Sequence, residues 1–264
     1  MRRKRNKYLF RRLSLLLPCL LLCAGCGAGG KNAAGETQEH KSGVFAMGTY
    51  MTLTAYGESA ADALALAEDK IGELESLWSV TDAGSDIYKV NHNGGAPAEI
   101  SGETTEVLAF ALDMAKRTDG ALDPTVSPLV TAWGFISGEY NIPTEDDLKN
   151  LLPYIDYKKV ILEENFVTLP EGMQLDLGAV GKGYTGDILS ELLKGQGVTS
   201  ALLDIGGNIQ MVGRRPDGSR WRLGIQNPER TAWVFWRVRT ALLSPPEIMN
   251  GILSGRTGNS MGTF

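Results

Sequence analysis

Cysteine and histidine are scarce in this sequence. Its 264 residues include three cysteines, Cys19, Cys23 and Cys26, and two histidines, His40 and His92. Because every cysteine lies at or before residue 26, the rest of the chain can form neither a disulfide nor a thiolate metal site. With so few histidines, no Ser–His or Cys–His nucleophile system can be assembled.

Positive charge is also scarce beyond the first segment. Seven of the 26 Lys and Arg residues precede Leu13, which leaves 19 against 31 Asp and Glu. So acidic a remainder argues against nucleic-acid binding. Hydrophobic residues make up 43% of the chain, enough for one or two globular cores.

The first segment has the order of an export signal. A basic cluster is followed by the apolar run Leu13 to Leu22 and then by Cys23-Ala24-Gly25-Cys26. The apolar run is too short for a membrane span. Ala-Gly before Cys26 resembles a bacterial lipobox, in which Cys26 becomes the lipidated first residue, although Cys23 stands where leucine is usual. The alternatives are an ordinary signal peptide or a tail anchor.

These features predict four regions. Residues 1–25 form a signal peptide, and residues 26–42 are a lipidated cysteine and a flexible tether rich in Gly, Ala, Lys and Glu. Residues 43–230 form the globular domain, and residues 231–264 are a separate tail. We expect the protein on the extracytoplasmic side of the cell membrane, held there by its lipid.

The helix and strand patterns together predict the α+β class. A helix from Ser59 to about Trp78 places Leu64, Ala67, Ile71, Leu74 and Trp78 on one face. Other predicted helices are 104–118 and a short one near residue 144. The predicted strands are 44–56, a hairpin of 159–162 with 166–169, 201–204 before a tight turn, and 221–226.

The stretch from Leu175 to Tyr184 organises the domain. It is predicted to be a short buried strand, a glycine turn and a helix. Asp176 enters the turn, and Lys182 lies at the helix start. Free N–H groups, glycine access and a lysine together suit a phosphate, and a carboxylate beside a phosphate suggests a divalent cation. Alternatively, the glycines only satisfy the geometry of the turn.

Two other stretches carry candidate residues. Tyr88, in a loop or short helix over 85–91, can stack on a flat ligand or cap an apolar cluster. Residues 120–130 hold two prolines and Asp123, which indicates a rigid buried loop. Asp123 is either a ligand or a residue that caps this loop.

Seven motifs together resemble the FAD:protein FMN transferase family, the ApbE-type flavin transferases. They occur in the family's order between about Val44 and Arg230: F-A-M-G-T-Y, S-D-I-Y-K-V-N, G-A-L-D-P-T-V-S-P-L-V, W-G-F, D-L-G-A-V-G-K-G-Y, L-L-D-I-G-G-N and L-G-I-Q-N-P. Each motif alone is weak, and the ordered set is specific. The lipobox fits as well, since many family members are exported lipoproteins.

The resemblance implies a fold, a reaction and a set of residues. The fold is that of the ApbE-like flavin transferases, one compact domain with a mixed or antiparallel sheet and flanking helices. FAD binds with Mg²⁺, a Thr or Ser hydroxyl of a partner flavoprotein attacks the FMN-side phosphorus, and AMP leaves. Asp176 and Lys182 would act at the nucleotide, and the Ala179 carbonyl would help to coordinate Mg²⁺. The nucleotide-binding residues implied are Met47, Tyr88, Ala121, Leu122, Asp123, Asp176 and Lys182. Asp204 and Asn208 would be supporting or structural.

Two other functions stay open. One is an exported hydrolase that cleaves FAD to FMN and AMP without a protein acceptor. The other is a lipoprotein that binds flavin without catalysis. Release of free FMN, or binding of FAD without turnover, would distinguish these functions from transfer.

After Arg230 the family motifs stop. The family's T-S-G-D-Y-E-R, its H-I segment and its A-D-A-x-A-T, which supplies Asp and Thr ligands for magnesium, are absent. Permitted codons for residues 239–264, read from the third base of the Arg239 codon, can encode DSAVVTSGDYERYFERTDGKQYGHI, which is the missing segment. We therefore expect a frameshift between about Arg230 and Trp233. The tail is then out of frame, and we expect it to have no regular structure. Without the strands that it replaces, apolar surface at Leu202, Leu203 and Ile225 is left partly uncovered. We therefore expect the chain to be poorly stable and catalytically impaired.

The lipobox leads to a first prediction. Replacing Cys26 with serine removes the thiol that carries the lipid, so Cys26→Ser should be unlipidated and shed from the membrane. Lipid labelling and membrane fractionation of the two forms measure this. Equal labelling and retention would rule out Cys26 as the anchor.

Overall fold

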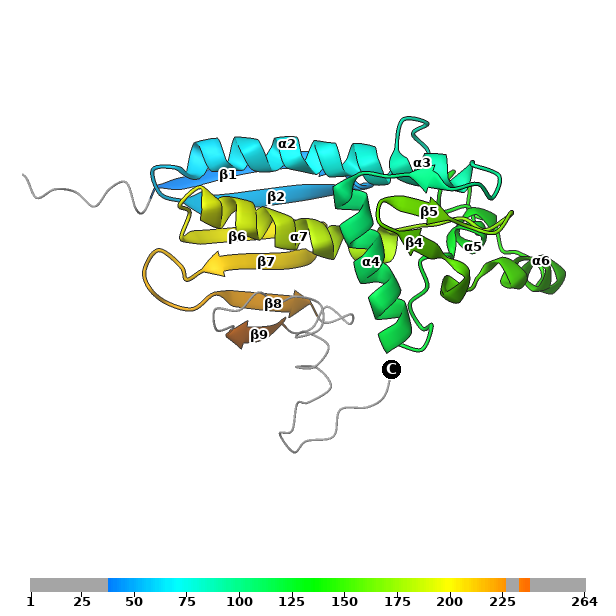
Figure 1. The fold of residues 1–264 in the computed structure, drawn as a ribbon. Coiled ribbons are helices and arrows are strands. Elements are labelled where there is room, and N and C mark those ends of the chain that lie inside the picture. The colour runs from blue at the N-terminus through cyan, green and yellow to red at the C-terminus, as the bar shows by residue number, and fades with distance from the viewer. Residues whose placement is uncertain (1–37, 227–232, 238–264) are drawn as a thin grey trace, which may run out of the picture. The chain divides into compact units, whose positions relative to one another are not determined.

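The computed structural model describes residues 38–226 and 233–237. The signal segment, Cys26 and most of the predicted tether lie outside these residues. Helices and mainly antiparallel strands alternate through the described chain, as predicted for the α+β class (Figure 1). None of the described helices combines the length and the apolar character that crossing a bilayer requires.

A four-stranded antiparallel sheet forms the larger half of the fold. Its strands are β1 (Glu39–Ala46), β2 (Thr49–Tyr56), β6 (Ser200–Ile205) and β7 (Asn208–Gly213), in the order β1-β2-β6-β7. The single strand predicted over 44–56 is therefore a hairpin. It turns at Met47 and Gly48, whose φ angles are 50° and 70°. β1 also begins at Glu39, within the predicted tether.

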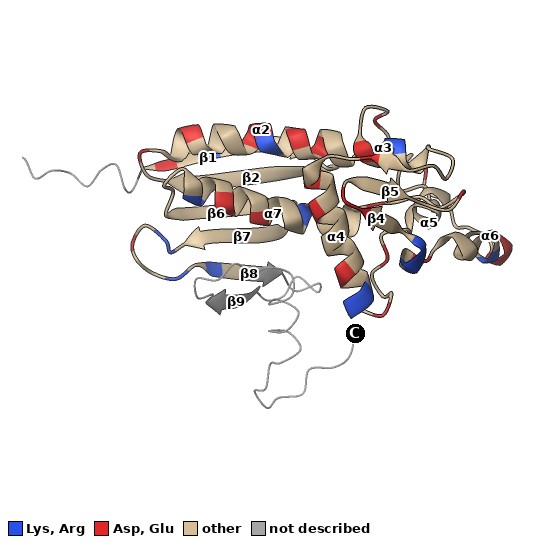
Figure 2. Ribbon diagram, viewed as in Figure 1, with Lys and Arg blue, Asp and Glu red and all other residues tan. Residues whose placement is uncertain are grey.

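Two helices pack against this sheet, α2 (Ala60–Trp78) and α7 (Gly178–Gly195) (Figure 1). The five residues predicted to form the apolar face of α2 are all buried, which confirms the periodicity reading. Acidic residues recur along α2 (Figure 2). On the same helix, Lys70 pairs with Glu73 at 3.0 Å and, across to α4 (Gly102–Arg117), with Glu103 at 3.2 Å.

A second hydrophobic cluster lies at the C-terminal end of α2. It is enclosed by α3 (Asp86–Asn91), α4 (Gly102–Arg117) and a small sheet of β3 (Ala98–Glu99), β5 (Phe166–Thr168) and β4 (Ile161–Glu163). α5 (Ser127–Ala132) begins inside the stretch 120–130 that was predicted as a rigid loop, so that prediction was wrong for residues 127–130, where Pro128 lies in the first helical turn. α6 (Glu145–Leu151) follows, as predicted near residue 144. Two 3₁₀ turns, Leu152–Tyr154 and Tyr157–Lys159, lead into β4.

The end of the described chain differs from expectation. β8 (Arg222–Gln226) pairs antiparallel with β9 (Trp233–Arg237), so residues after Arg230 do contain a strand. Leu203 is fully buried in the main core and Leu202 is partly buried. The expectation of exposed apolar surface was therefore wrong for Leu203, and the Ile225 side chain lies outside what the structure describes.

Asp86 joins α3 to α4 and leads to a prediction about stability. Its buried carboxylate accepts hydrogen bonds from the Ser101 amide and the Thr104 hydroxyl, both at 2.8 Å. Burial alone would raise the pKa of Asp86, but the hydrogen bonds from Ser101 and Thr104, helped by Lys89, hold this pKa below its usual value.

A carboxyl with a lowered folded-state pKa stabilises the fold above its unfolded pKa of about 3.9, and this contribution is lost as the pH falls through the folded value. We expect Asp86→Asn to lower the free energy of unfolding at pH 7 by about 1–3 kcal/mol. The variant should also lose less stability than the parent between about pH 5 and 2. Denaturant titrations across pH measure both effects, and parallel curves would mean that Asp86 contributes no titratable stability.

Candidate functional site

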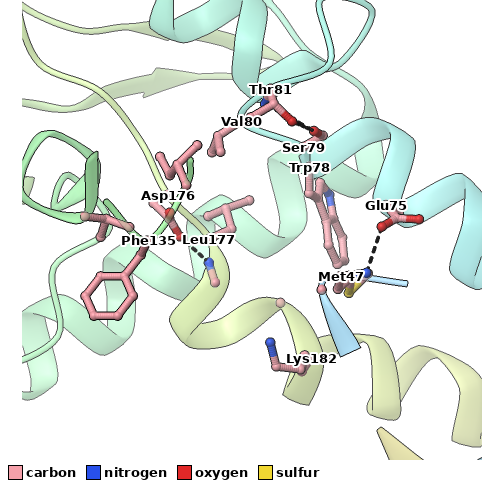
Figure 3. A pocket seen from close by; sticks show the side chains of 15 residues that line it. Met47, Glu75, Trp78, Ser79, Val80, Thr81, Phe135, Asp176, Leu177 and Lys182 are labelled. Carbon is pink, nitrogen blue, oxygen red and sulfur yellow. Dashed lines mark hydrogen bonds between the residues drawn. The ribbon is translucent and has the colours of Figure 1, made fainter. Parts of the chain in front are cut away.

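A pocket of about 400 Å³ opens where the β1–β2 turn, the end of α2, the end of α5 and the start of α7 meet (Figure 3). This volume lies within the range of small-molecule sites. The lining residues come from four separate parts of the chain: Met47, Gly48, Glu75, Trp78, Ser79, Val80, Thr81, Val130, Phe135, Ile136, Asp176, Leu177, Gly178, Gly181 and Lys182.

The organising stretch forms one side of this pocket, with a local structure that differs from the prediction. Residues 175–177 are not a strand. They have no regular secondary structure and are held by other contacts, and α7 already begins at Gly178. Gly178, Gly181 and Gly183 are therefore helical residues, and Lys182 lies in the second turn of α7, beyond the helix start where it was predicted.

The Asn91 side chain replaces the missing strand partner. Its amide nitrogen donates to the Leu175 carbonyl at 2.9 Å, and its amide oxygen accepts from the Leu175 N–H at 2.7 Å. The next amide, that of Asp176, donates to the Pro124 carbonyl at 2.8 Å. These three bonds fix the segment that carries Asp176 into the pocket.

Asp176 and Lys182, two of the residues predicted for the nucleotide site, both line the pocket. Asp176 Oδ1 accepts the Gly178 N–H at 2.6 Å, and a Cβ on Gly178 would lie 2.8 Å from that oxygen. Glycine at 178 thus leaves room for the carboxylate. Lys182 is partly buried, and its ammonium group makes no ion pair or hydrogen bond with another described residue, so it can meet an anionic ligand.

Met47 also lies in the pocket wall. Its N–H donates to Glu75 Oε1 at 2.8 Å, and the buried Thr185 hydroxyl contacts its sulfur at 3.7 Å. Together with Trp78, Val80 and Phe135 it forms an apolar wall beside the charged end of the pocket. Such a pairing suits a ligand that joins a flat ring system to a phosphate.

Tyr88 is not among the pocket-lining residues. Its ring stacks on His92, with centroids 3.9 Å apart and planes at 19°, and Tyr88 is not among the residues packed against either hydrophobic cluster. The aromatic rings at the pocket are Trp78 and Phe135. Periodicity placed Trp78 correctly in the core, where it is 7% exposed, but gave no sign that it also borders a cavity.

The loop residues Ala121, Leu122 and Asp123 also lie outside the pocket lining. Asp123 Oδ1 accepts from the amide and the hydroxyl of Thr125, at 2.8 and 2.6 Å, and its Oδ2 accepts from the Tyr157 amide at 3.0 Å. Both carboxylate oxygens are thus engaged in holding the loop. Asp123 was predicted to be either a ligand or a residue that caps the loop. In the structure its carboxylate caps the loop.

The remaining candidates have mainly local contacts. Asp204 Oδ1 accepts from the Gly207 amide at 2.7 Å across the β6–β7 turn, and Asn208 begins β7. Ala179 is exposed in the first turn of α7. Within the described ranges, no three His, Cys, Asp or Glu side chains gather in a way that could hold a metal ion. The two pocket carboxylates, Asp176 and Glu75, each accept a backbone N–H, so these residues alone do not complete a magnesium site.

This chain is similar in sequence to proteins of known family. The ApbE family model matches residues 47–247, which reaches beyond the last recognised motif. A FAD:protein FMN transferase of Vibrio cholerae is 29% identical, over 83% of this chain and 66% of its own length. One of Treponema pallidum is also 29% identical, over 80% and 64%. This chain thus spans just under two thirds of these relatives.

Solved structures give the same fold. The ApbE protein of Thermotoga maritima and the flavin transferase ApbE of Vibrio cholerae each superpose with a TM-score of 0.70 at 24% identity, covering 76% of this chain and 68% of theirs. The flavinyl transferase ApbE of Pseudomonas stutzeri superposes equally well, at 25% identity. These likenesses confirm the predicted fold class.

Proposed function

This chain belongs to the ApbE family, and from that membership we propose that its site transfers the FMN part of FAD to a hydroxyl of a partner protein. The observation that carries the proposal is the meeting of Met47, Asp176 and Lys182 in one pocket at the start of α7. These residues come from two motifs, one around Met47 and one around Asp176 and Lys182. The two motifs lie far apart in the sequence. A lysine without a protein partner beside an apolar wall suits a flavin nucleotide.

The proposed reaction is a phosphoryl transfer. The oxygen of an acceptor Thr or Ser forms a bond to the FMN-side phosphorus while the bond from that phosphorus to the bridging oxygen breaks. AMP leaves, and the hydroxyl proton passes to solvent or a nearby base. Catalysis of this kind rests on positioning and charge neutralisation. Lys182 would neutralise phosphate charge, and Asp176, held by Gly178 and the Pro124 carbonyl, would fix the geometry of the ligand.

Magnesium is part of the proposal and would neutralise further phosphate charge when bound. Mg²⁺ in nucleotide sites usually takes one or two carboxylates together with phosphate oxygens and water. Asp176 is the described carboxylate nearest this role, with the Ala179 carbonyl proposed from the family resemblance. The Asp and Thr ligands that the family carries would belong to the segment after Arg230 that this reading frame replaces.

The partner and the location are proposed from sequence features alone. The acceptor would be a flavoprotein subunit with a Thr or Ser flavinylation site. The lipid on Cys26 would hold the enzyme at the extracytoplasmic side of the cell membrane. An acceptor on the same side of the membrane would then be within reach of the pocket.

One assay tests the function and the reading frame together. The chain as given and a gene with the proposed frame restored are each incubated with FAD, Mg²⁺ and a candidate acceptor, and the acceptor mass is measured. We expect FMN on the acceptor with the restored chain, and a rate lower by about a thousandfold or more with the chain as given, because charge-neutralising ligands are missing.

Each result of this assay has a separate meaning. Equal transfer by both chains would disprove the frameshift and leave the function intact. Release of free FMN without acceptor labelling would identify a hydrolase, and FAD binding without turnover by either chain would identify a flavin-binding lipoprotein.

Asp176 provides a prediction for the restored chain. Asp176→Ala should retain the fold and lower the transfer rate by about 10²–10³-fold, because it removes a carboxylate from the charged end of the pocket. Asp176→Asn keeps an oxygen for the Gly178 amide and separates charge from local structure. A normal rate in Asp176→Ala, with an unchanged melting temperature, would make Asp176 structural only.

A further inference from the structure

The β1–β2 turn has an unusual residue at its first position. Both turn residues have positive φ, 50° at Met47 and 70° at Gly48. Two-residue hairpin turns of this kind favour Asn-Gly or Asp-Gly, because a longer side chain with positive φ is sterically disfavoured. Methionine therefore costs stability at this position. Non-glycine residues held in this way tend to cluster at functional sites.

Met47 is held in place from two helices. Glu75 on α2, 28 positions along the chain, accepts the Met47 N–H at 2.8 Å (Figure 3). Thr185 on α7 is fully buried and directs its hydroxyl to the Met47 sulfur at 3.7 Å. The Met47 side chain also packs against both hydrophobic clusters of the fold. It is thus a contact point between the two cores as well as part of the pocket wall.

The Glu75 hydrogen bond is not required to satisfy a buried group. It lies at an exposed position, where water could accept the Met47 N–H equally well. Its specific effect is geometric, because it ties the turn to the last turns of α2. We propose that Glu75 is a positioning residue, whose carboxylate holds the β1–β2 turn so that Met47 forms a fixed wall for the flat ring of the ligand.

This inference rests on the proposed function, since it takes a flavin nucleotide as the ligand. A thioether is polarisable and packs well against aromatic rings. The expected gain in affinity comes from preorganisation. A pocket wall that is already ordered loses no conformational freedom when the ligand binds. Loss of the tether should therefore weaken binding without unfolding the chain.

Replacement of the strained residue separates ligand binding from stability. In the frame-restored chain, Met47→Asn creates the favoured Asn-Gly turn but also removes the methionine packing between the two cores, so the two effects on stability oppose each other and the melting temperature should change by less than about 2–4 °C. FAD affinity, measured by fluorescence titration, should fall about tenfold because the wall is lost. Weaker FAD binding at nearly unchanged stability supports the proposal. An unchanged affinity would show that Met47 serves the turn alone and would overturn it.

The Glu75 variants test the tether itself. Glu75→Ala should speed hydrogen exchange of the Met47 amide and weaken FAD binding about five- to tenfold, the effect of about one hydrogen bond. Glu75→Gln retains an acceptor oxygen and should restore both measurements to within about twofold of the parent chain. Asp69→Ala, an exposed carboxylate on the same helix away from the pocket, is the matched control.

The two measurements distinguish the possible failures. Unchanged amide exchange in Glu75→Ala would disprove the tether, whatever happens to flavin. Faster exchange with unchanged FAD affinity would overturn the positioning role and leave the proposed function standing. No FAD binding by the frame-restored parent chain would overturn the proposed function, and this inference with it.

Discussion

The paired hydrogen bonds between the Asn91 side chain and the Leu175 backbone are the constraint on which the site depends. Asn91 ends α3, and Leu175 leads into α7, so the two bonds join elements that are 84 positions apart. An asparagine amide offers one donor and one acceptor, the same pair that a neighbouring strand would offer. The backbone N–H and C=O of Leu175 therefore both have a hydrogen-bond partner in a side chain. Asp176, the next residue, lies at the pocket.

This arrangement explains where sequence reasoning succeeded and where it failed. Helix α2 was predicted to within a residue because its apolar spacing is regular over five turns. The strand assigned to residues 175–177 was wrong because an apolar run does not reveal whether its partner is a strand or a side chain. The hairpin at Met47 was missed because Met-Gly is not a recognised turn pair.

The pocket residues differ in the same way, in whether the sequence pattern could reveal them. Asp176 and Lys182 were found because glycines, a carboxylate and a lysine lie within a few residues of one another. Tyr88 was chosen from its motif for its ring, whereas the contact that reaches the site from this motif is made by Asn91. Trp78, Thr81 and Phe135 reach the pocket only through tertiary packing, which neither spacing nor composition encodes.

The order of strands in the main sheet determines when this domain can fold. β2 is complete at Tyr56, yet its inner neighbour β6 spans 200–205. At ribosomal rates of roughly 5–20 residues per second, the hairpin waits about 8–30 s for that partner. During this interval the backbone groups of β2 that pair with β6 have no strand partner, although α2, the next element made, can already cover the buried side chains of Met51, Leu53 and Ala55. A nascent chain of this topology therefore depends on delayed strand pairing, because its first strands cannot be completed locally.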